Sequence, residues 1–161
     1  MADNSVVIKF EARSINEGFA RLAVAAFMME MNPTMDELQD VKTAVSEAVT
    51  NAIVHGYGED FEAKKEVVPE VEMRCQRYGR KIVITISDTG TGIENVEEAR
   101  QPFFTTKADM DRSGMGFSFM ETFMDSVEVL SEIGKGTTVI LSKCIGEQEE
   151  FTLCEQGGGE Q

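Results

Sequence analysis

One helix places the strongest constraint on how this chain can fold. Thr34 and Glu37 stand in capping-box spacing, which predicts a helix over about residues 35–55. Its apolar residues recur with helical spacing and form one stripe: Leu38, Val41, Val45, Ala48, Val49 and Ala52. At about 100° per residue, Glu47 and Asn51 fall roughly opposite the stripe, as do Thr43, Thr50 and Val54. The helix therefore buries one face and presents a carboxylate and a carboxamide, one turn apart, on the other.

The flanking segments alternate between strand and helix patterns. Apolar residues in alternation predict a strand over residues 5–12, and Ser14 and Glu17 in capping-box spacing predict a helix that runs to about Met31. Further strands are expected over residues 67–76 and 81–87, short helices over 96–99 and 116–123, and a hairpin over 126–131 and 137–143. This order predicts an α/β fold, a two-layer α/β sandwich with a mixed, mostly antiparallel sheet.

Length and charge narrow the functional classes. With 161 residues the chain fits one domain, expected over residues 1–145, followed by an acidic tail over 146–161 that is expected to be disordered. The chain carries 15 basic and 29 acidic residues, a formal net charge of -14. Nucleic-acid binding relies on lysine and arginine to neutralise phosphates, so no direct nucleic-acid binding is expected.

The expected compartment is the cytoplasm. No apolar run approaches the roughly 18 residues that span a bilayer, so no membrane association is expected, and the N-terminus lacks the pattern of a signal peptide. The three cysteines are widely spaced and odd in number, which favours reduced thiols over a disulfide framework.

Three blocks carry candidate chemistry. The first is "SEAVTNAIVHG" around Glu47 and Asn51, the second is "DTGTGI" after a predicted strand, and the third is "RSGMGF" before a predicted helix. Glycines let a backbone approach a ligand, and a helix start attracts phosphate. Each block alone also fits a structural explanation: a solvated glutamate and amide, a turn after a strand, and a common two-glycine turn. The GxxxxGK[ST] phosphate loop does not occur.

Taken in this order, the blocks resemble the Bergerat nucleotide-binding pattern of the GHKL superfamily, which includes gyrase-type ATPases, Hsp90, histidine kinases and MutL. The phrases "SEAVTNAIVHGYG", "EEARQPFFTTK", "RSGMGF", "NEGFARLAVAAF" and "KGTTV" are more specific. They resemble the anti-sigma F factor family of sporulating bacteria (the stage II sporulation protein AB family). The similarity spans roughly Ile8 to Ser142 and implies the histidine-kinase-like ATPase fold.

The resemblance implies a site for ATP or ADP and Mg²⁺. In it, Asn51 offers its side-chain oxygen to the ion, Glu47 accepts the proton of an incoming serine hydroxyl, and Asp88 accepts a hydrogen bond from the adenine amino group. The other implied nucleotide contacts come from glycines beside the base, from a lid and from the last hairpin: Gly90, Gly92, Thr105, Thr106, Lys107, Ser113, Gly114, Met115, Gly116, Phe117 and Thr137.

The resemblance also implies partners. Family members are anti-sigma factors and protein serine/threonine kinases: they bind a sporulation sigma factor (sigma F), which blocks its association with RNA polymerase, and phosphorylate a serine of an anti-anti-sigma factor. Arg21 corresponds to a residue that contacts both proteins, and part of "LAVAAFMMEM" is expected in a homodimer interface. Two alternatives stay open: an ATP-dependent binding module without kinase activity, and a related stress-response anti-sigma serine kinase. An ATPase clamp or a detached histidine-kinase domain fits less well.

Overall fold

A computed structural model of the chain describes residues 1–56, 68–101 and 116–146. Its strands form a five-stranded sheet in the order β1-β2-β3-β5-β4, and all four pairings are antiparallel. The strands are β1 (Asn4–Glu11), β2 (Glu70–Tyr78), β3 (Lys81–Ser87), β4 (Ser126–Glu132) and β5 (Gly136–Cys144). The predicted α/β sandwich is confirmed, but the described sheet is antiparallel throughout and not mixed.

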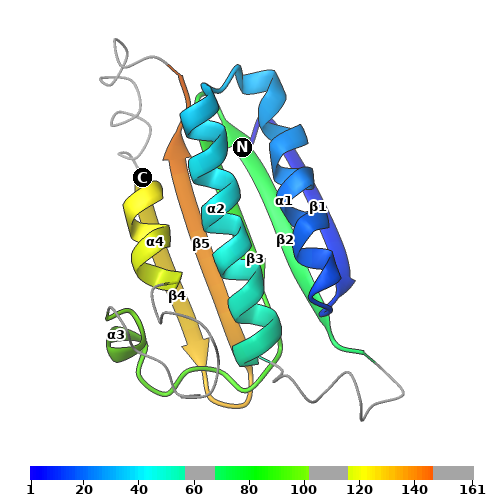
Figure 1. The fold of residues 1–161 in the computed structure, drawn as a ribbon, viewed down its shortest axis with the longest axis vertical. Coiled ribbons are helices and arrows are strands. Elements are labelled where there is room, and N and C mark those ends of the chain that lie inside the picture. The colour runs from blue at the N-terminus through cyan, green and yellow to red at the C-terminus, as the bar shows by residue number, and fades with distance from the viewer. Residues whose placement is uncertain (57–67, 102–115, 147–161) are drawn as a thin grey trace.

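The main helices lie side by side over one face of this sheet (Figure 1). They are α1 (Ile15–Met28), α2 (Met35–Asn51) and α4 (Gly116–Phe123), with the short α3 (Val96–Ala99) at one end of the sheet. A 3₁₀ turn, Met29–Met31, extends α1, and a π-helical turn, Ala52–Gly56, extends α2. No helix within the described ranges is both long and apolar enough to cross a membrane.

The core lies between the sheet and the helices. Alternate residues of the central strands are buried, namely Val71, Met73 and Cys75 on β2 and Ile82, Ile84 and Ile86 on β3. Helix α2 meets them with its predicted apolar stripe, in which Val41, Val45, Ala48 and Val49 are at most 1% exposed. Burial of each valine stabilises the fold by about 1.5–3 kcal/mol, which fixes α2 over the sheet and sets where its polar residues lie.

Two residues expected on the polar face of α2 are instead buried. Thr50 and Val54 are each only 8% exposed. Helix α2 lies between α1 on one side and α4 on the other (Figure 1), so its flanks are covered as well as the face on the sheet. A single-helix projection does not contain those neighbours, and for this reason it misplaced both residues.

The two predicted capping boxes have different outcomes. At the start of α2, the Glu37 amide donates to Thr34 Oγ1 and the Thr34 amide donates to the Glu37 carboxylate, so this box is confirmed. At the start of α1, Ser14 is helical (φ -55°, ψ -32°) and makes no side-chain capping bond, so that box is wrong. Glu17 accepts a hydrogen bond from Ser46 Oγ of α2 instead.

The two cysteines within the described residues differ in state. Cys75 is a free thiol in the core, and burial raises its pKa to about 12, which makes it unreactive. Cys144, at the end of β5, is disulfide-bonded. The expectation of reduced thiols is therefore wrong for Cys144.

Candidate functional site

Glu47 and Asn51 lie one turn apart on α2 and face the start of α4. A Cβ atom placed on Gly116 would come within 3.0 Å of Asn51 Nδ2, 3.4 Å of Asn51 Oδ1 and 3.3 Å of Glu47 Oε2. Both side chains are half-buried. The first residue of α4 thus lies directly against the predicted carboxylate–amide pair, and only glycine leaves this approach free of steric contact.

The electrostatics of this corner suit an anion next to a polar pair. The amides at a helix start point outward with the positive end of the helix dipole, so the beginning of α4 attracts phosphate. Asn51 supplies a neutral oxygen and Glu47 a carboxylate beside it. The structure therefore brings together three of the predicted residues, Glu47, Asn51 and Gly116, from two helices far apart in the sequence.

Asp88 lies just after β3 and is only 8% exposed. Burial raises the pKa of its carboxyl group, while hydrogen bonds from the backbone of Gly90 and Thr137 partly oppose the rise. The Gly90 amide lies 2.9 Å from Asp88 Oδ1, and the Asp88 amide donates to the Thr137 carbonyl at 2.9 Å. Thr137 thus reaches the Asp88 region across the sheet, as the sequence interpretation expected.

Close backbone packing explains two glycines of this region. Gly136 has φ +104°, and a Cβ there would lie 2.1 Å from the Asp88 carbonyl oxygen. Gly92 has φ +77°, and a Cβ there would lie 2.2 Å from the Glu132 carbonyl oxygen. The "DTGTGI" loop therefore packs tightly against the β4–β5 turn, and this contact requires glycine at position 92.

Ser131 holds the loop after Asp88 in place, a role that the sequence interpretation missed. Its Oγ accepts from the Ile93 amide at 2.8 Å, donates to the Gly136 carbonyl at 3.0 Å and lies 2.8 Å from Thr137 Oγ1. It joins the loop after Asp88 to the hairpin that carries Thr137. A serine in a predicted strand has no local signal for such a role, because the contact depends on pairing across 38 residues.

Of the remaining predicted nucleotide contacts, only those from the start of α4 onward lie within the described residues. Phe117 is half-buried and packs against the hydrophobic core. An ion pair of 2.6 Å between Arg100 and Glu121 holds the segment after α3 against the same helix. The other predicted residues of this group lie outside the described residues: Thr105, Thr106, Lys107, Ser113, Gly114 and Met115.

Arg21 lies on α1 and is 45% exposed. Its Nε lies 3.6 Å from the carboxylate of Glu17, one turn earlier, and Glu17 also accepts the bond from Ser46. Ser46 directly precedes Glu47 in the sequence. A chain of polar contacts therefore runs from the predicted partner residue to the neighbour of the predicted base.

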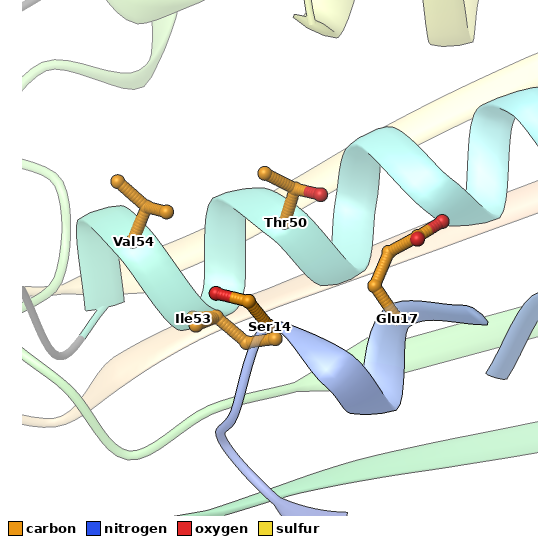
Figure 2. A pocket seen from close by; sticks show the side chains of 5 residues that line it. All are labelled: Ser14, Glu17, Thr50, Ile53 and Val54. Carbon is orange, nitrogen blue, oxygen red and sulfur yellow. The ribbon is translucent and has the colours of Figure 1, made fainter. Parts of the chain in front are cut away.

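A pocket of about 90 Å³ lies between the start of α1 and the end of α2. Figure 2 shows its lining residues: Ser14, Glu17, Thr50, Ile53 and Val54. Thr50 of α2 and Ile53 and Val54 of the π-helical turn form a buried wall, and Ser14 lies at an exposed rim. The pocket is thus on the α1 side of α2, whereas Glu47 and Asn51 face α4.

The residues present fit Mg²⁺ held together with a triphosphate. Within the described residues no group of three His, Cys, Asp or Glu side chains could hold a metal ion by itself. Mg²⁺ commonly uses one or two protein oxygens, phosphate oxygens and water, so one amide beside a phosphate-attracting helix start is sufficient. Asn51 against Gly116 provides that arrangement.

The family model of the histidine kinase-like ATPase domain matches residues 10–143 of this chain. A solved structure of the RsbU and RsbW domains of Rv1364c from Mycobacterium tuberculosis superposes with a TM-score of 0.60 at 18% identity, covering 88% of this chain and 32% of that one. At this identity the likeness concerns the fold alone.

Curated relatives are much more similar. An anti-sigma F factor of Clostridium perfringens (strain SM101 / Type A) is 54% identical over 141 residues, which cover 88% of this chain and 96% of the relative. One of Geobacillus sp. (strain WCH70) is 53% identical over 151 residues, which cover 94% and 98%. One of Clostridium kluyveri (strain NBRC 12016) is 52% identical over 143 residues, covering 89% and 96%.

Proposed function

Because this chain belongs to the anti-sigma F factor family and carries a histidine kinase-like ATPase domain, we propose that it holds sigma F away from RNA polymerase and phosphorylates a serine of an anti-anti-sigma factor. The observation that carries the kinase part is the position of Glu47 and Asn51 against Gly116. A base, a metal-binding amide and a phosphate-attracting helix start meet there.

In the proposed reaction Glu47 accepts the proton of the serine hydroxyl. The serine oxygen forms a bond to the γ-phosphorus of ATP while the bond from that phosphorus to the bridging oxygen breaks, so the γ-phosphoryl group moves to serine and ADP leaves. Mg²⁺ supplies charge neutralisation on the phosphates when bound, and Asn51 is the residue that would hold it. A positioned base contributes about 10²–10⁴-fold.

Asp88 is proposed to recognise adenine. Its buried carboxylate can accept a hydrogen bond from the exocyclic amino group, and such a charge-assisted bond is stronger than a neutral one. The bonds from Gly90 and Thr137 orient the carboxyl group. Thr137, Gly90 and Gly92 form the surrounding wall, and the residues expected in the lid complete the phosphate contacts.

We propose that helix α1 carries the residues that bind the partners. Arg21 is exposed and suited to an acidic partner residue. An apolar stripe on this helix and its 3₁₀ extension remains exposed, with Ile15 at 82%, Phe19 at 56%, Leu22 at 67% and Met29 at 55%. Large apolar side chains gathered on one helix face indicate an interaction surface, and we assign it to a homodimer.

The proposed compartment is the cytoplasm, where thiol systems would reduce the Cys144 disulfide.

A phosphorylation assay tests the function. The full chain is incubated with ATP, Mg²⁺ and the anti-anti-sigma factor of the same organism, and phosphoserine is measured by mass spectrometry. Formation of phosphoserine that depends on Glu47 supports the kinase. Tight binding of ATP and of both partners, without any transfer, would instead support the binding module without kinase activity.

A further inference from the structure

Asp88, Thr137 and Ser131 lie in one row across the sheet. Thr137 pairs with Ser131 in the register of β5 with β4, and on its other side the Asp88 amide donates to the Thr137 carbonyl at 2.9 Å. Cross-strand neighbours direct their side chains to the same face of a sheet, with Cβ atoms about 4.5–5.5 Å apart. This face is the one that the helices cover, because Ile86, two residues before Asp88, is buried in the core. The proposed adenine-binding carboxylate therefore has the side chain of Thr137 beside it.

The hydroxyl group of Ser131 has three hydrogen-bonding neighbours. Its Oγ lies 2.8 Å from the Ile93 amide nitrogen, 3.0 Å from the Gly136 carbonyl oxygen and 2.8 Å from Thr137 Oγ1. An amide N–H only donates, and a carbonyl oxygen only accepts. A serine hydroxyl group has one hydrogen and two lone pairs. The Ile93 amide therefore takes one lone pair, and the Gly136 carbonyl takes the single hydrogen.

The bond between the two hydroxyl groups consequently has one direction. Because the hydrogen of Ser131 is directed to the Gly136 carbonyl, its oxygen can only accept from Thr137. The opposite direction would break the bond to that carbonyl. Thr137 thus donates its own hydroxyl hydrogen to Ser131, and the lone pairs of Thr137 Oγ1 are what it offers to any other group. Ser131 turns a side chain that can donate or accept into an acceptor.

Two acceptors side by side define the chemical group that fits them. The Asp88 carboxylate is buried and takes the Gly90 amide at its Oδ1, 2.9 Å away. Thr137 Oγ1 is the acceptor beside it. An amino group on a purine ring has two hydrogens, one for each acceptor, whereas a carbonyl oxygen at the same place adds a third acceptor. In a buried site, water poorly replaces the hydrogen bonds that are then lost.

We propose that Ser131 is a specificity-determining positioning residue, which holds the Thr137 hydroxyl group as an acceptor so that the site prefers a 6-amino purine to a 6-oxo purine. The proposal rests on the proposed function, in which Asp88 recognises adenine. Ser131 acts through Thr137 and does not contact the nucleotide itself.

ATP and inosine triphosphate (ITP) test this role, because position 6 of the base carries an amino group in ATP and an oxygen in ITP. Isothermal titration with the Mg²⁺ complex of each gives the ratio of the two dissociation constants. The adjacent ring nitrogen also differs, but that difference is the same for every variant. In Ser131→Ala the hydroxyl hydrogen of Thr137 is free to turn toward the oxygen of ITP. We expect the preference for ATP to fall by about five- to tenfold, which corresponds to one hydrogen bond.

The ratio distinguishes this role from a purely structural one. Ser131 also bonds Ile93 and Gly136, so its loss can loosen the loop after Asp88. A looser loop weakens ATP and ITP by the same factor, and an unchanged ratio therefore contradicts the proposal even if both affinities fall. Ser131→Thr keeps a hydroxyl group and should keep the wild-type ratio. If it lost the preference as Ser131→Ala does, the hydroxyl group would not be the cause.

Thr137→Val is the second test, because valine has the shape of threonine and no hydroxyl group. It should lower the preference for ATP, and adding Ser131→Ala to it should change the ratio no further. Additive effects on the ratio would contradict the proposal. Thr138→Val is the matched control, since Thr138 lies on the opposite face of the sheet with its Oγ1 3.0 Å from Ser87 Oγ. Ser126→Ala, at an exposed position of β4, is the control for Ser131→Ala. Both controls should keep the wild-type ratio.

The outcomes separate this inference from the proposed function. If the wild type binds ATP and ITP equally tightly, the specificity inference is wrong, while serine phosphorylation with ATP still supports the kinase. If the wild type binds neither nucleotide, the proposed function fails and the inference fails with it. If Ser131→Ala does not fold, Ser131→Cys takes its place, because a thiol keeps the volume and is only a weak acceptor. The preference for ATP should fall in that variant as well, and an unchanged ratio would overturn the inference.

Discussion

Gly116 and Asn51 are 65 positions apart in the sequence, yet a single added carbon on Gly116 would lie 3.0 Å from the Asn51 amide nitrogen. This contact joins α4 to α2 at the point where the proposed phosphate and metal contacts meet. Because Gly116 has no side chain, the backbone at the start of α4 can approach the polar pair of Glu47 and Asn51 closely.

Replacing Gly116 with alanine is expected to weaken Mg²⁺–ATP binding by up to about tenfold, since displaced side chains of Asn51 and Glu47 leave their preferred rotamers. Isothermal titration with Mg²⁺–ATP measures the effect. Gly18→Ala is the matched control, because its Cβ would meet only Arg21, at 3.8 Å. The control should keep ATP affinity and gain about 0.5–1 kcal/mol of stability. Equal ATP affinity in both variants would contradict the proposed site.

Glu47→Gln is expected to lower serine phosphorylation by about 10²–10⁴-fold, because glutamine keeps the shape of the side chain and cannot accept the proton. ATP affinity should change little. Transfer is measured in a single turnover with excess enzyme, and ATP affinity by titration. Glu30→Gln, at an exposed position of the turn after α1, is the control. If the variant lost both ATP binding and serine phosphorylation, Glu47 would not be assigned as the base.

Asp88→Asn is expected to change how stability depends on pH. Burial raises the pKa of Asp88 above 3.8, so between that value and the raised pKa the folded state holds more protons than the unfolded chain. The free energy of unfolding therefore falls as pH rises through this window. Asparagine does not titrate, so the variant should lose this part of the slope. Urea denaturation of the nucleotide-free protein at increasing pH measures it.

The same variant should bind ATP less tightly at neutral pH, because asparagine accepts a weaker hydrogen bond from adenine than a carboxylate does. Glu128→Gln, an exposed carboxylate on β4, is the control for both measurements. An unchanged pH slope would mean that Asp88 has the same pKa in the folded and unfolded states. Unchanged ATP affinity would separate Asp88 from adenine recognition.

Gly136→Ala is expected to destabilise the protein severely and to weaken ATP binding. The new Cβ would lie 2.1 Å from the Asp88 carbonyl oxygen, so β5 or the loop must shift. Gly134→Ala separates backbone strain from collision, because it has φ +81° and nothing within 4 Å of the Cβ. That control should cost only about 1–2 kcal/mol. Thermal unfolding compares the two, and equal costs would contradict the collision.

Phe19→Ser with Leu22→Ser is expected to shift the protein from dimer to monomer, because both apolar side chains are more than half exposed on α1. Sedimentation velocity at several concentrations measures the change. Met35→Ser removes another exposed apolar side chain, 78% exposed at the start of α2, and should keep the dimer. A double variant that remains dimeric would place the interface elsewhere.

Local signals predicted several elements well. The bounds of Lys81–Ser87, Val96–Ala99 and Gly116–Phe123 agree with the structure, because glycines or polar turns flank these short segments. The capping box of Thr34 also holds, since its bonds are local to one helical turn. The predicted helix to residue 55 is α-helical only as far as Asn51 and continues as a π-helical turn.

Other features depended on neighbours that a single sequence does not display. Ser14 has a capping pattern, but packing against α2 directs Glu17 to Ser46. Likewise, the contact of Gly116 with Glu47 and the bonds of Ser131 to two segments require the complete sheet. The polar pair of the site was predicted by resemblance, whereas its partner across the helix interface comes from the structure.

Ser46 and Glu47 are consecutive, yet the first bonds to α1 and the second faces α4. One inserted residue between the cap at Thr34 and Ser46 would rotate everything after it by about 100°. Serine would then occupy the direction of the base, and the base would point to the wrong neighbour. The number of residues between Thr34 and Asn51 therefore determines which neighbour each side chain faces. Relatives that retain the chemistry should tolerate substitutions along this helix far better than changes in its length.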